Sequence, residues 1–185
     1  MDPESSPSKP SEVGLRRAVQ ADLPYLCRLA QDPLVEPFLA PAAGAPERLE
    51  AILDQGDSDG EPCGLFVIEL PAGRPVGGLA LQLLSQRSRL CELTRLMVDP
   101  QVRRSGVGAQ AVSLACRRSL LEHDFHRIQV ETYGDNLAAQ RLFERVGLVR
   151  EGVQRRAYWR RGKWLDGVRY GILAEDLRDL EAPAG

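Results

Sequence analysis

The segment from residue 99 to residue 121 constrains the fold of this chain more than any other. The pair Asp99-Pro100 ends an apolar stretch, and two arginines then lead into Gly106-Val107-Gly108, after which small and apolar residues continue. Glycines at the start of a helix let a ligand approach the main chain without meeting a Cβ. The free N–H groups and the dipole of the helix attract negative charge. The segment therefore predicts a strand, then a loop that binds an anion, then a long helix.

One anion that fits such a loop is a dinucleotide. Gly106, Gly108 and Ala111 satisfy the G-x-G-x-x-A fingerprint, and Glu131 ends a later strand at the offset of a ribose-binding acid. That fingerprint requires the strand to run directly into the first glycine. Here a polar, proline-containing segment separates Val98 from Gly106. NAD(P) is therefore the less favoured ligand.

The other anion is a pyrophosphate. In the arrangement Arg103-x-x-Gly106-x-Gly108-Ala109, successive N–H groups point at one spot and Arg104 adds positive charge beside it. A helix start that only needs flexible residues explains one glycine, but neither the second glycine nor the arginine pair. We favour a pyrophosphate cradle.

The remaining sequence predicts one mixed sheet with helices inserted around the glycine loop. Short turns connect three successive strands, which indicates an antiparallel meander, and Asp22 is the expected N-cap of the first helix. Residues 1–12 are rich in Ser and Pro and are expected to form a disordered tail before a single domain of residues 13–180. The strands are expected at residues 13–19, 63–70, 75–85, 89–98, 126–133, 148–159 and 164–174. The helices are expected at residues 20–32, 46–56, 107–122 and 136–147.

The loop resembles the acetyl-coenzyme A loop of the GNAT superfamily of N-acetyltransferases, which has the pattern R/Q-x-x-G-x-G/A between a strand and a long helix. Residues 135–152, DNLAAQRLFERVGLVREG, are similar to the family segment N-x-x-A-x-x-x-[Y/F]-x-x-x-G-F, which lies along the pantetheine arm of the cofactor. Residues 150–173 resemble the ending of the branch that contains ribosomal-protein-alanine, polyamine and amino-acid acetyltransferases. The resemblance covers residues 13–175. It implies an α/β fold with a mostly antiparallel central sheet, splayed at a cofactor wedge and flanked by helices.

The resemblance also implies an enzyme that transfers the acetyl group of acetyl-CoA to a primary amine. The acceptor would be a small-molecule amine, an amino acid or a peptide N-terminus, and a homodimer is compatible with the sequence. Asn136 is in addition a good helix N-cap. The residues implied to bind acetyl-CoA are Met97, Val98, Arg103, Arg104, Ser105, Gly106, Val107, Gly108, Ala109, Asn136, Ala139 and Phe143.

Acetyl transfer to an amine needs a base, because the amine is protonated near neutral pH. Glu92 lies where histone-type members of the family carry a catalytic glutamate, and Glu131 lies where the ribosomal-protein-alanine branch carries its base. Either glutamate can act directly or through one water, and Glu92 is favoured. The backbone N–H of Val98 is implied as the donor to the developing oxyanion.

The acid that would protonate the departing thiolate is absent from its usual place. The family commonly has a tyrosine seven residues after the asparagine, and this chain has Phe143 there. Water or a tyrosine from another element must then supply the proton. Because this hydroxyl is missing, a second function is also compatible with the sequence: a sensor that binds acetyl-CoA without turnover. The candidate tyrosines are Tyr133, Tyr158 and Tyr170.

Composition and charge argue against several other classes of function. The net charge of −2 gives no electrostatic footprint for nucleic acid. No apolar run approaches the roughly 18 residues of a membrane helix, so a cytoplasmic protein without membrane partners is expected. His123 and His126 lack companions with ligand-like spacing, so no metal is expected, and the four cysteines are expected to be reduced thiols.

Basic residues crowd the closing strand pair. This pattern is typical of a solvated hairpin, and it is also compatible with a surface that binds an acceptor carboxylate, because Arg matches carboxylates well. The second interpretation disfavours a polycationic acceptor such as a polyamine. The residues are Arg150, Arg155, Arg156, Arg160, Arg161 and Lys163.

Overall fold

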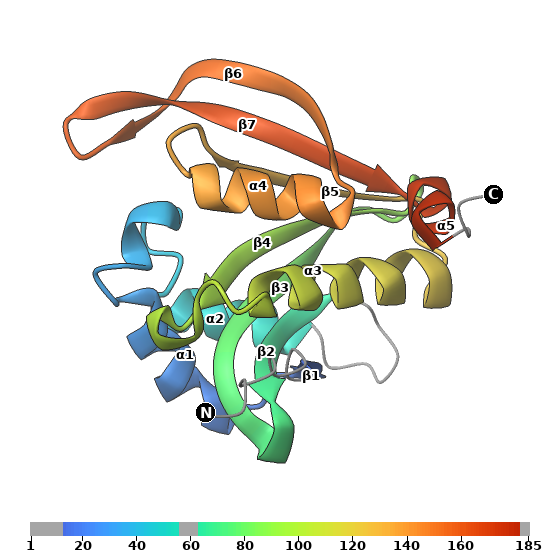
Figure 1. Cartoon of the computed structure of the whole chain (residues 1–185). Helices are drawn as coiled ribbons and strands as arrows, with labels where there is room; N and C mark the ends of the chain where they lie inside the picture. The colour runs from blue at the N-terminus through green and yellow to red at the C-terminus, as the bar shows by residue number, and fades with distance from the viewer. Residues whose placement is uncertain (1–12, 56–62, 182–185) are drawn as a thin grey trace, which may run out of the picture.

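A computed structural model describes residues 13–55 and 63–181 of the chain, which share a single seven-stranded sheet (Figure 1). The tail predicted at residues 1–12 lies outside the described residues. The strands are β1 (Gly14–Arg17), β2 (Gly64–Leu70), β3 (Arg74–Ser85), β4 (Leu90–Val98), β5 (Arg127–Tyr133), β6 (Val149–Arg160) and β7 (Lys163–Leu173). Their order in space is β1-β2-β3-β4-β5-β7-β6, and all neighbours are antiparallel except the parallel pair β4 and β5. The predicted α/β fold and its antiparallel meander are confirmed.

Helices cover both faces of this sheet. They are α1 (Leu23–Ala30), α2 (Pro46–Gln55), α3 (Val107–Arg117), α4 (Leu137–Val146) and α5 (Ala174–Glu181). Val107 and Ala111 of α3 and Phe143 of α4 share one buried cluster with Ile128 of β5. Leu26 of α1 and Leu49 of α2 share a second buried cluster with Val67 of β2. Each face of the sheet is therefore closed by a helix pair whose apolar residues lie on one side of the helix.

The parallel pairing of β4 with β5 stops half-way along both strands. It runs from Leu90 opposite Arg127 to Leu93 opposite Val130, while β5 stays paired with β7 as far as Tyr133. On its other side β4 carries a bulge, since Gly78 faces Met97 and Ala80 faces Thr94. A bulge bends and twists its strand. Beyond Leu93, β4 therefore leaves β5, and the splayed sheet that the family resemblance implies is present.

Two local predictions need correction. The helix expected at residues 107–122 is α-helical only to Arg117, and Arg118–Glu122 form a turn of π-helix in which the N–H of His123 donates to the Arg118 carbonyl (3.0 Å). Asp22 does not cap α1. Its carboxylate accepts from the N–H of Val19 (2.8 Å) and pairs with Arg16 (2.8 Å), so it closes the short 3-10 turn before α1.

The close approach of β3 and β4 at the bulge predicts that Gly77 tolerates no side chain. A Cβ there would stand 2.3 Å from the Met97 carbonyl oxygen, which is backbone and cannot rotate away. We expect Gly77→Ala to lower the free energy of unfolding by about 2 kcal/mol, as overpacking does. Denaturant titration measures this.

The matched control is Gly152→Ala, where a Cβ would meet no atom within 4 Å. We expect a change of about 0.5 kcal/mol or less for this substitution. Equal stability of the two variants would contradict the tight contact at the bulge.

Candidate active site

The loop before α3 has the geometry of an anion cradle. Gly106 is the N-cap of α3 with a left-handed backbone (φ 86°), a conformation that costs glycine little. The first helical bond of α3 is from the N–H of Gln110 to the Gly106 carbonyl (3.0 Å), so the N–H groups of Val107, Gly108 and Ala109 lack partners within the helix. A Cβ at Gly106 would meet only the Gln110 amide nitrogen, 3.7 Å away. The start of α3 thus offers free donors beside open space.

Gly108 has a second role beside the one that its position in the motif suggests. A Cβ at Gly108 would stand 2.8 Å from Leu142 Cδ1 and 3.4 Å from Val98 Cγ2. The missing side chain therefore lets α3 pack closely against α4 and the end of β4. Close packing of the helices is therefore a second reason for a glycine at this position, beside the predicted approach of a phosphate.

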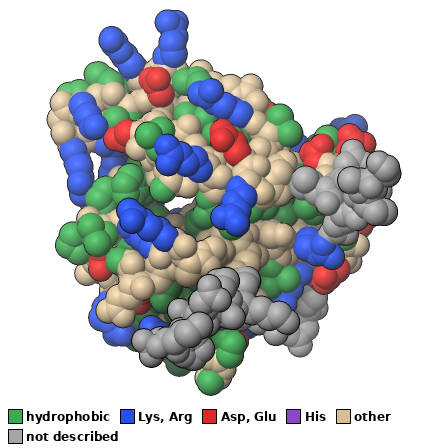
Figure 2. Space-filling view, in the orientation of Figure 1, with side chains coloured by type: hydrophobic (Ala, Val, Ile, Leu, Met, Phe, Trp, Pro, Cys, Tyr) green, Lys and Arg blue, Asp and Glu red, His purple; other side chains and the backbone are tan. Residues whose placement is uncertain are grey.

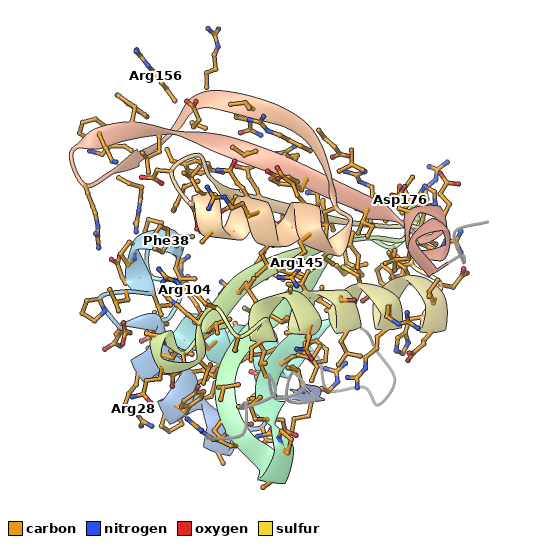
Figure 3. All side chains as sticks on the ribbon, viewed as in Figure 1. Arg28, Phe38, Arg104, Arg145, Arg156 and Asp176 are labelled. Atoms are coloured by element: carbon orange, nitrogen blue, oxygen red, sulfur yellow. The ribbon has the colours of Figure 1, made fainter. Side chains whose placement is uncertain are left out.

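The two arginines of the loop differ in their contacts. Arg103 donates from Nε to the Val98 carbonyl (3.3 Å) and from Nη2 to the Leu34 carbonyl (2.9 Å), so it ties the loop to the end of β4. Arg104 is exposed, and among the described residues no polar contact engages its guanidinium. Figure 3 shows Arg104 on this loop and Arg145 on α4, on the same side of the molecule. Ser105 donates its hydroxyl to the Val102 carbonyl (2.6 Å).

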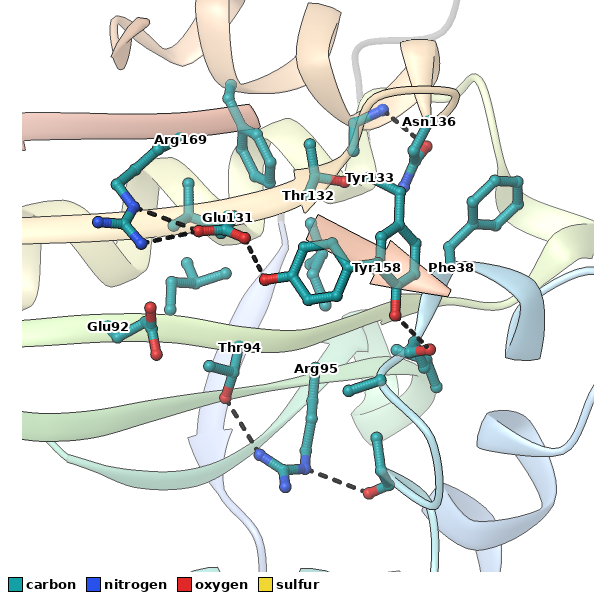
Figure 4. A pocket seen from close by; sticks show the side chains of 18 of the residues that line it. Phe38, Glu92, Thr94, Arg95, Glu131, Thr132, Tyr133, Asn136, Tyr158 and Arg169 are labelled. Carbon is teal, nitrogen blue, oxygen red and sulfur yellow. Dashed lines mark hydrogen bonds and ion pairs between the residues drawn. The ribbon is translucent and has the colours of Figure 1, made fainter. Parts of the chain in front are cut away.

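A cavity of about 480 Å³ lies where β4 and β5 diverge. Figure 2 shows an opening near the centre of one face, with Lys and Arg side chains beside it. Residues 92–96 of β4 and 130–133 of β5 line the cavity, together with residues 38–40 of the segment between α1 and α2 (Figure 4). The predicted residues that it brings together are Glu92, Glu131, Asn136, Ala139 and Phe143. The other predicted residues lie beside it, at the end of β4 (Met97, Val98) and in the loop and first turn of α3 (Arg103, Arg104, Ser105, Gly106, Val107, Gly108, Ala109).

The two glutamates of the cavity have unequal surroundings. Glu131 accepts from Arg169 Nη2 (2.9 Å), from the Tyr158 hydroxyl and from Gln154 Nε2 (3.4 Å). Glu92 accepts from Gln129 Nε2 alone among the described residues (3.2 Å). The lone pairs of Glu131 are largely committed, whereas those of Glu92 are available to a ligand or a water.

Of the three candidate tyrosines, two line the cavity and one does not. Phe143 is buried and packs against Tyr170, whose hydroxyl donates to Glu144 (3.0 Å) and which does not line the cavity. Tyr133 and Tyr158 do line it. Burial raises the pKa of Tyr158 to about 12, with a further contribution from its hydrogen bond to Glu131. Burial also raises the pKa of Tyr133, so both tyrosines keep their proton at neutral pH.

Arg95 is a charged cavity residue that the sequence analysis did not select. It occupies the bulge of β4 with a left-handed backbone (φ 53°), which is unusual outside glycine. Its Nε donates to the Ala43 carbonyl (3.1 Å) and its Nη1 to the Thr94 hydroxyl (3.3 Å). Burial and the nearby charge of Arg48 lower its pKa. The only signal in the sequence is an arginine inside a mostly apolar strand.

The basic residues of the closing hairpin do not form one surface. Arg160 packs against the Tyr133 ring and pairs with Glu36 (3.1 Å), which also pairs with Arg161 (2.6 Å). Lys163 pairs with Asp135 (3.1 Å). These three side chains tie the hairpin to neighbouring segments. Arg150, Arg155 and Arg156 are exposed and lie outside the cavity lining.

A family model described as the acetyltransferase (GNAT) family matches residues 24–148, which include β4, the glycine loop, α3, β5 and α4. The chain belongs to the GNAT acetyltransferase family. The family predicted from the sequence is thereby confirmed, and acetyl-CoA as co-substrate accords with this membership. Of the helices in the described part of the chain, none is long and apolar enough to cross a membrane. Within residues 13–55 and 63–181, no group of three His, Cys, Asp or Glu residues could hold a metal ion.

The chain is similar to several known proteins. It is 29% identical to mycothiol acetyltransferase of Saccharopolyspora erythraea over 127 residues, which cover 65% of this chain and 38% of that protein. It is 26% identical to the SPbeta prophage-derived uncharacterized N-acetyltransferase YokL of Bacillus subtilis over 82 residues, 44% of this chain and 46% of that protein. The chain thus spans less than half the length of these curated relatives.

Solved structures share the fold at lower identity. The spermidine N-acetyltransferase of Vibrio cholerae in complex with CoA and spermine has a TM-score of 0.78 and 21% identity over 90% of this chain and 98% of that chain. A chimera of that enzyme has a TM-score of 0.79 and 21% identity over 91% of this chain and 99% of its own. At these identities the likeness shows the fold alone.

The packing at Gly108 generates a prediction. Gly108→Val should destabilise the protein by about 2 kcal/mol because its branched side chain would overlap Leu142 and Val98. The double variant Gly108→Val, Leu142→Ala should be more stable than the sum of the two single changes predicts, because truncation of Leu142 relieves the overlap. Thermal and denaturant unfolding of the four proteins in this cycle measure the coupling. Strict additivity would contradict the contact.

Proposed function

We propose that this protein is an acetyl-CoA-dependent N-acetyltransferase that acts on a primary amine. One observation carries the proposal: β4 and β5 stop pairing at Leu93 and Val130, where a cavity with two glutamates lies, and the chain continues from the end of β4 to the amide donors at the start of α3. The edges of both strands are unpaired along the opening. An extended chain can hydrogen-bond to such an edge as an added strand does.

Acetyl-CoA supplies the acetyl thioester, and residues at the opening could bind its pyrophosphate and its pantetheine arm. The N–H groups of Val107, Gly108 and Ala109 would bind the pyrophosphate, and Arg104 would add charge, whereas Arg103 holds the loop in place. The end of β4 at Met97 and Val98 and the α4 residues Ala139 and Phe143 would lie along the pantetheine. Asn136 caps α4 by accepting from the N–H of Ala139 (3.2 Å) and lines the cavity as well. The Ser105 hydroxyl closes the loop by donating to the Val102 carbonyl.

The base in this proposal is Glu92. Its carboxylate faces the cavity with one amide partner, so it can accept a proton from the acceptor ammonium, directly or through a water. Glu131, held by Arg169 and Tyr158, positions the wall of the cavity. It is the alternative base if the ligand displaces those partners.

The remaining two roles fall to the backbone and to a tyrosine or water. The N–H of Asp99 donates to the Val76 carbonyl of β3 (2.9 Å), so by strand alternation the N–H of Val98 points away from β3 and toward the opening. There it would stabilise negative charge on the thioester oxygen. Since Phe143 carries no proton, the thiolate would be protonated by water or by Tyr133 or Tyr158, the two tyrosines of the cavity.

A specific observation favours a second candidate, a protein that binds acetyl-CoA without turnover. Phe143 is buried where the family commonly has a tyrosine, and Tyr170 beside it is committed to Glu144. NAD(P) chemistry fits less well, because β4 does not run into Gly106 and a short 3-10 turn, Pro100–Val102, intervenes. A homodimer and a cytoplasmic location stay predictions.

Substitution of the base tests the proposal. Glu92→Gln should leave the Kd for acetyl-CoA unchanged in calorimetry and lower kcat by roughly 10²-fold near neutral pH. The loss should shrink as the pH rises, because a growing fraction of the amine is then deprotonated without a base. Release of CoA thiol over a panel of amines measures the rate. Glu131→Gln is the matched comparison, with a smaller expected loss.

Three results would change this account. A larger loss in Glu131→Gln than in Glu92→Gln would move the base to Glu131. Tight acetyl-CoA binding without thiol release on any amine would favour the sensor. Binding of NAD(P) without any binding of CoA would overturn the proposed cofactor.

A further inference from the structure

We propose that Arg95 forms a carboxylate-binding subsite in the cavity, so that the acetylated amine also carries a carboxylate group. This inference rests on the proposed function, since it names the class of acceptor for the same site. Amino acids and peptides with an acidic residue near the N-terminus are the two sources of such an acceptor.

The placement of Arg95 is the first support. The bulge puts its backbone in the left-handed region, where a side chain costs about 1–2 kcal/mol more than glycine does. Strained residues of this kind persist when the surrounding structure holds them, and they gather at functional sites. Here the strain aims a guanidinium at the cavity, where Ala43 and Thr94 hold two of its nitrogens (Figure 4). The third nitrogen, Nη2, has no protein acceptor among the described residues.

The charges around Arg95 are the second support. The other half-buried arginines near the cavity have carboxylate partners: Arg169 pairs with Glu131 (2.9 Å) and Arg160 with Glu36 (3.1 Å). No described carboxylate forms an ion pair with Arg95, and its pKa is lowered by burial and, to a smaller extent, by the positive charge of Arg48. A half-buried guanidinium without a counter-charge is stabilised by an anionic ligand, and its planar fork suits a carboxylate.

The balance of charge selects the class of acceptor. Glu131 and Arg169 neutralise each other, which leaves Glu92 and Arg95 as the uncompensated charges of the cavity lining. Both lie on β4, one before and one after Thr94. A molecule with an ammonium and a carboxylate matches this pair, with its amine toward the base Glu92. A polyamine would instead bring positive charge against Arg95 and leave it unpaired.

Matched substrate pairs test the inference. The rate of thiol release is measured for free amino acids and their carboxamides, for dipeptides with an acidic or an amide second residue, and for spermidine. The wild type should prefer the acid of a pair over its amide at least tenfold in kcat/KM, mainly through KM. In Arg95→Gln this ratio should fall to between one and three, and Arg95→Lys should restore part of it.

The control is Arg155→Gln, which removes an exposed hairpin arginine outside the cavity and should keep the preference. Calorimetry of acetyl-CoA with each variant shows that the protein is folded. Comparison of the rates with free amino acids and with dipeptides shows which of the two kinds of acceptor the protein uses. Three results would overturn the subsite while the proposed function stands. They are equal kcat/KM values of the wild type for the acid and the amide, a preference for the acid that survives in Arg95→Gln, and a higher kcat/KM for spermidine than for the acids.

A binding arm separates failure of the subsite from failure of catalysis. The amino acid that gives the largest heat is titrated into CoA-saturated protein, where no transfer can occur. Binding that weakens at least tenfold in Arg95→Gln supports the subsite even if no amine is acetylated. Absence of binding to the wild type, or equal binding to both proteins, overturns it.

Discussion

The bulge between β3 and β4 is the constraint on which the rest of the site depends. One extra residue between Thr94 and Met97 bends β4, and β4 leaves its parallel neighbour after Leu93. Gly77 makes this bend compatible with close pairing, because its missing Cβ leaves room for the Met97 carbonyl. The same bend opens the cavity, leaves the facing edges of β4 and β5 unpaired and places Arg95 in the lining of the cavity. One irregularity of the backbone thus produces both halves of the site.

The polar contacts around the cavity fix its shape more than they stabilise the fold. The pair Glu131–Arg169 is half-exposed at its arginine, and such pairs contribute about 1 kcal/mol or less. Together with the hydroxyl of Tyr158, however, it locks the β5 side of the opening to the closing hairpin. The stability of the site comes from the two buried clusters on either face of the sheet. The ion pairs decide which charges are left for a ligand, and these are Glu92 and Arg95.

Much of this arrangement could be predicted from the sequence, because local rules govern it. The left-handed turn at Gly106 and the cap at Asn136 follow from short patterns that need no tertiary contact. Three other features depend on side chains of other elements of the fold. The packing of Gly108 depends on Leu142 of another helix, and the contacts of Asp22 depend on Arg16 of β1. The placement of Arg95 depends on a register shift between two strands that neither strand reveals alone.

Amide-resolved NMR of the labelled protein, titrated with CoA, tests the central claim most directly. If the opening between β4 and β5 and the start of α3 bind the cofactor, the largest shifts should fall on the N–H groups of Val98, Val107, Gly108 and Ala109. Amides of the distant strand β1 should change little. Saturable CoA binding that leaves the chemical shifts of those four amides unchanged and alters those of a different surface would contradict the account.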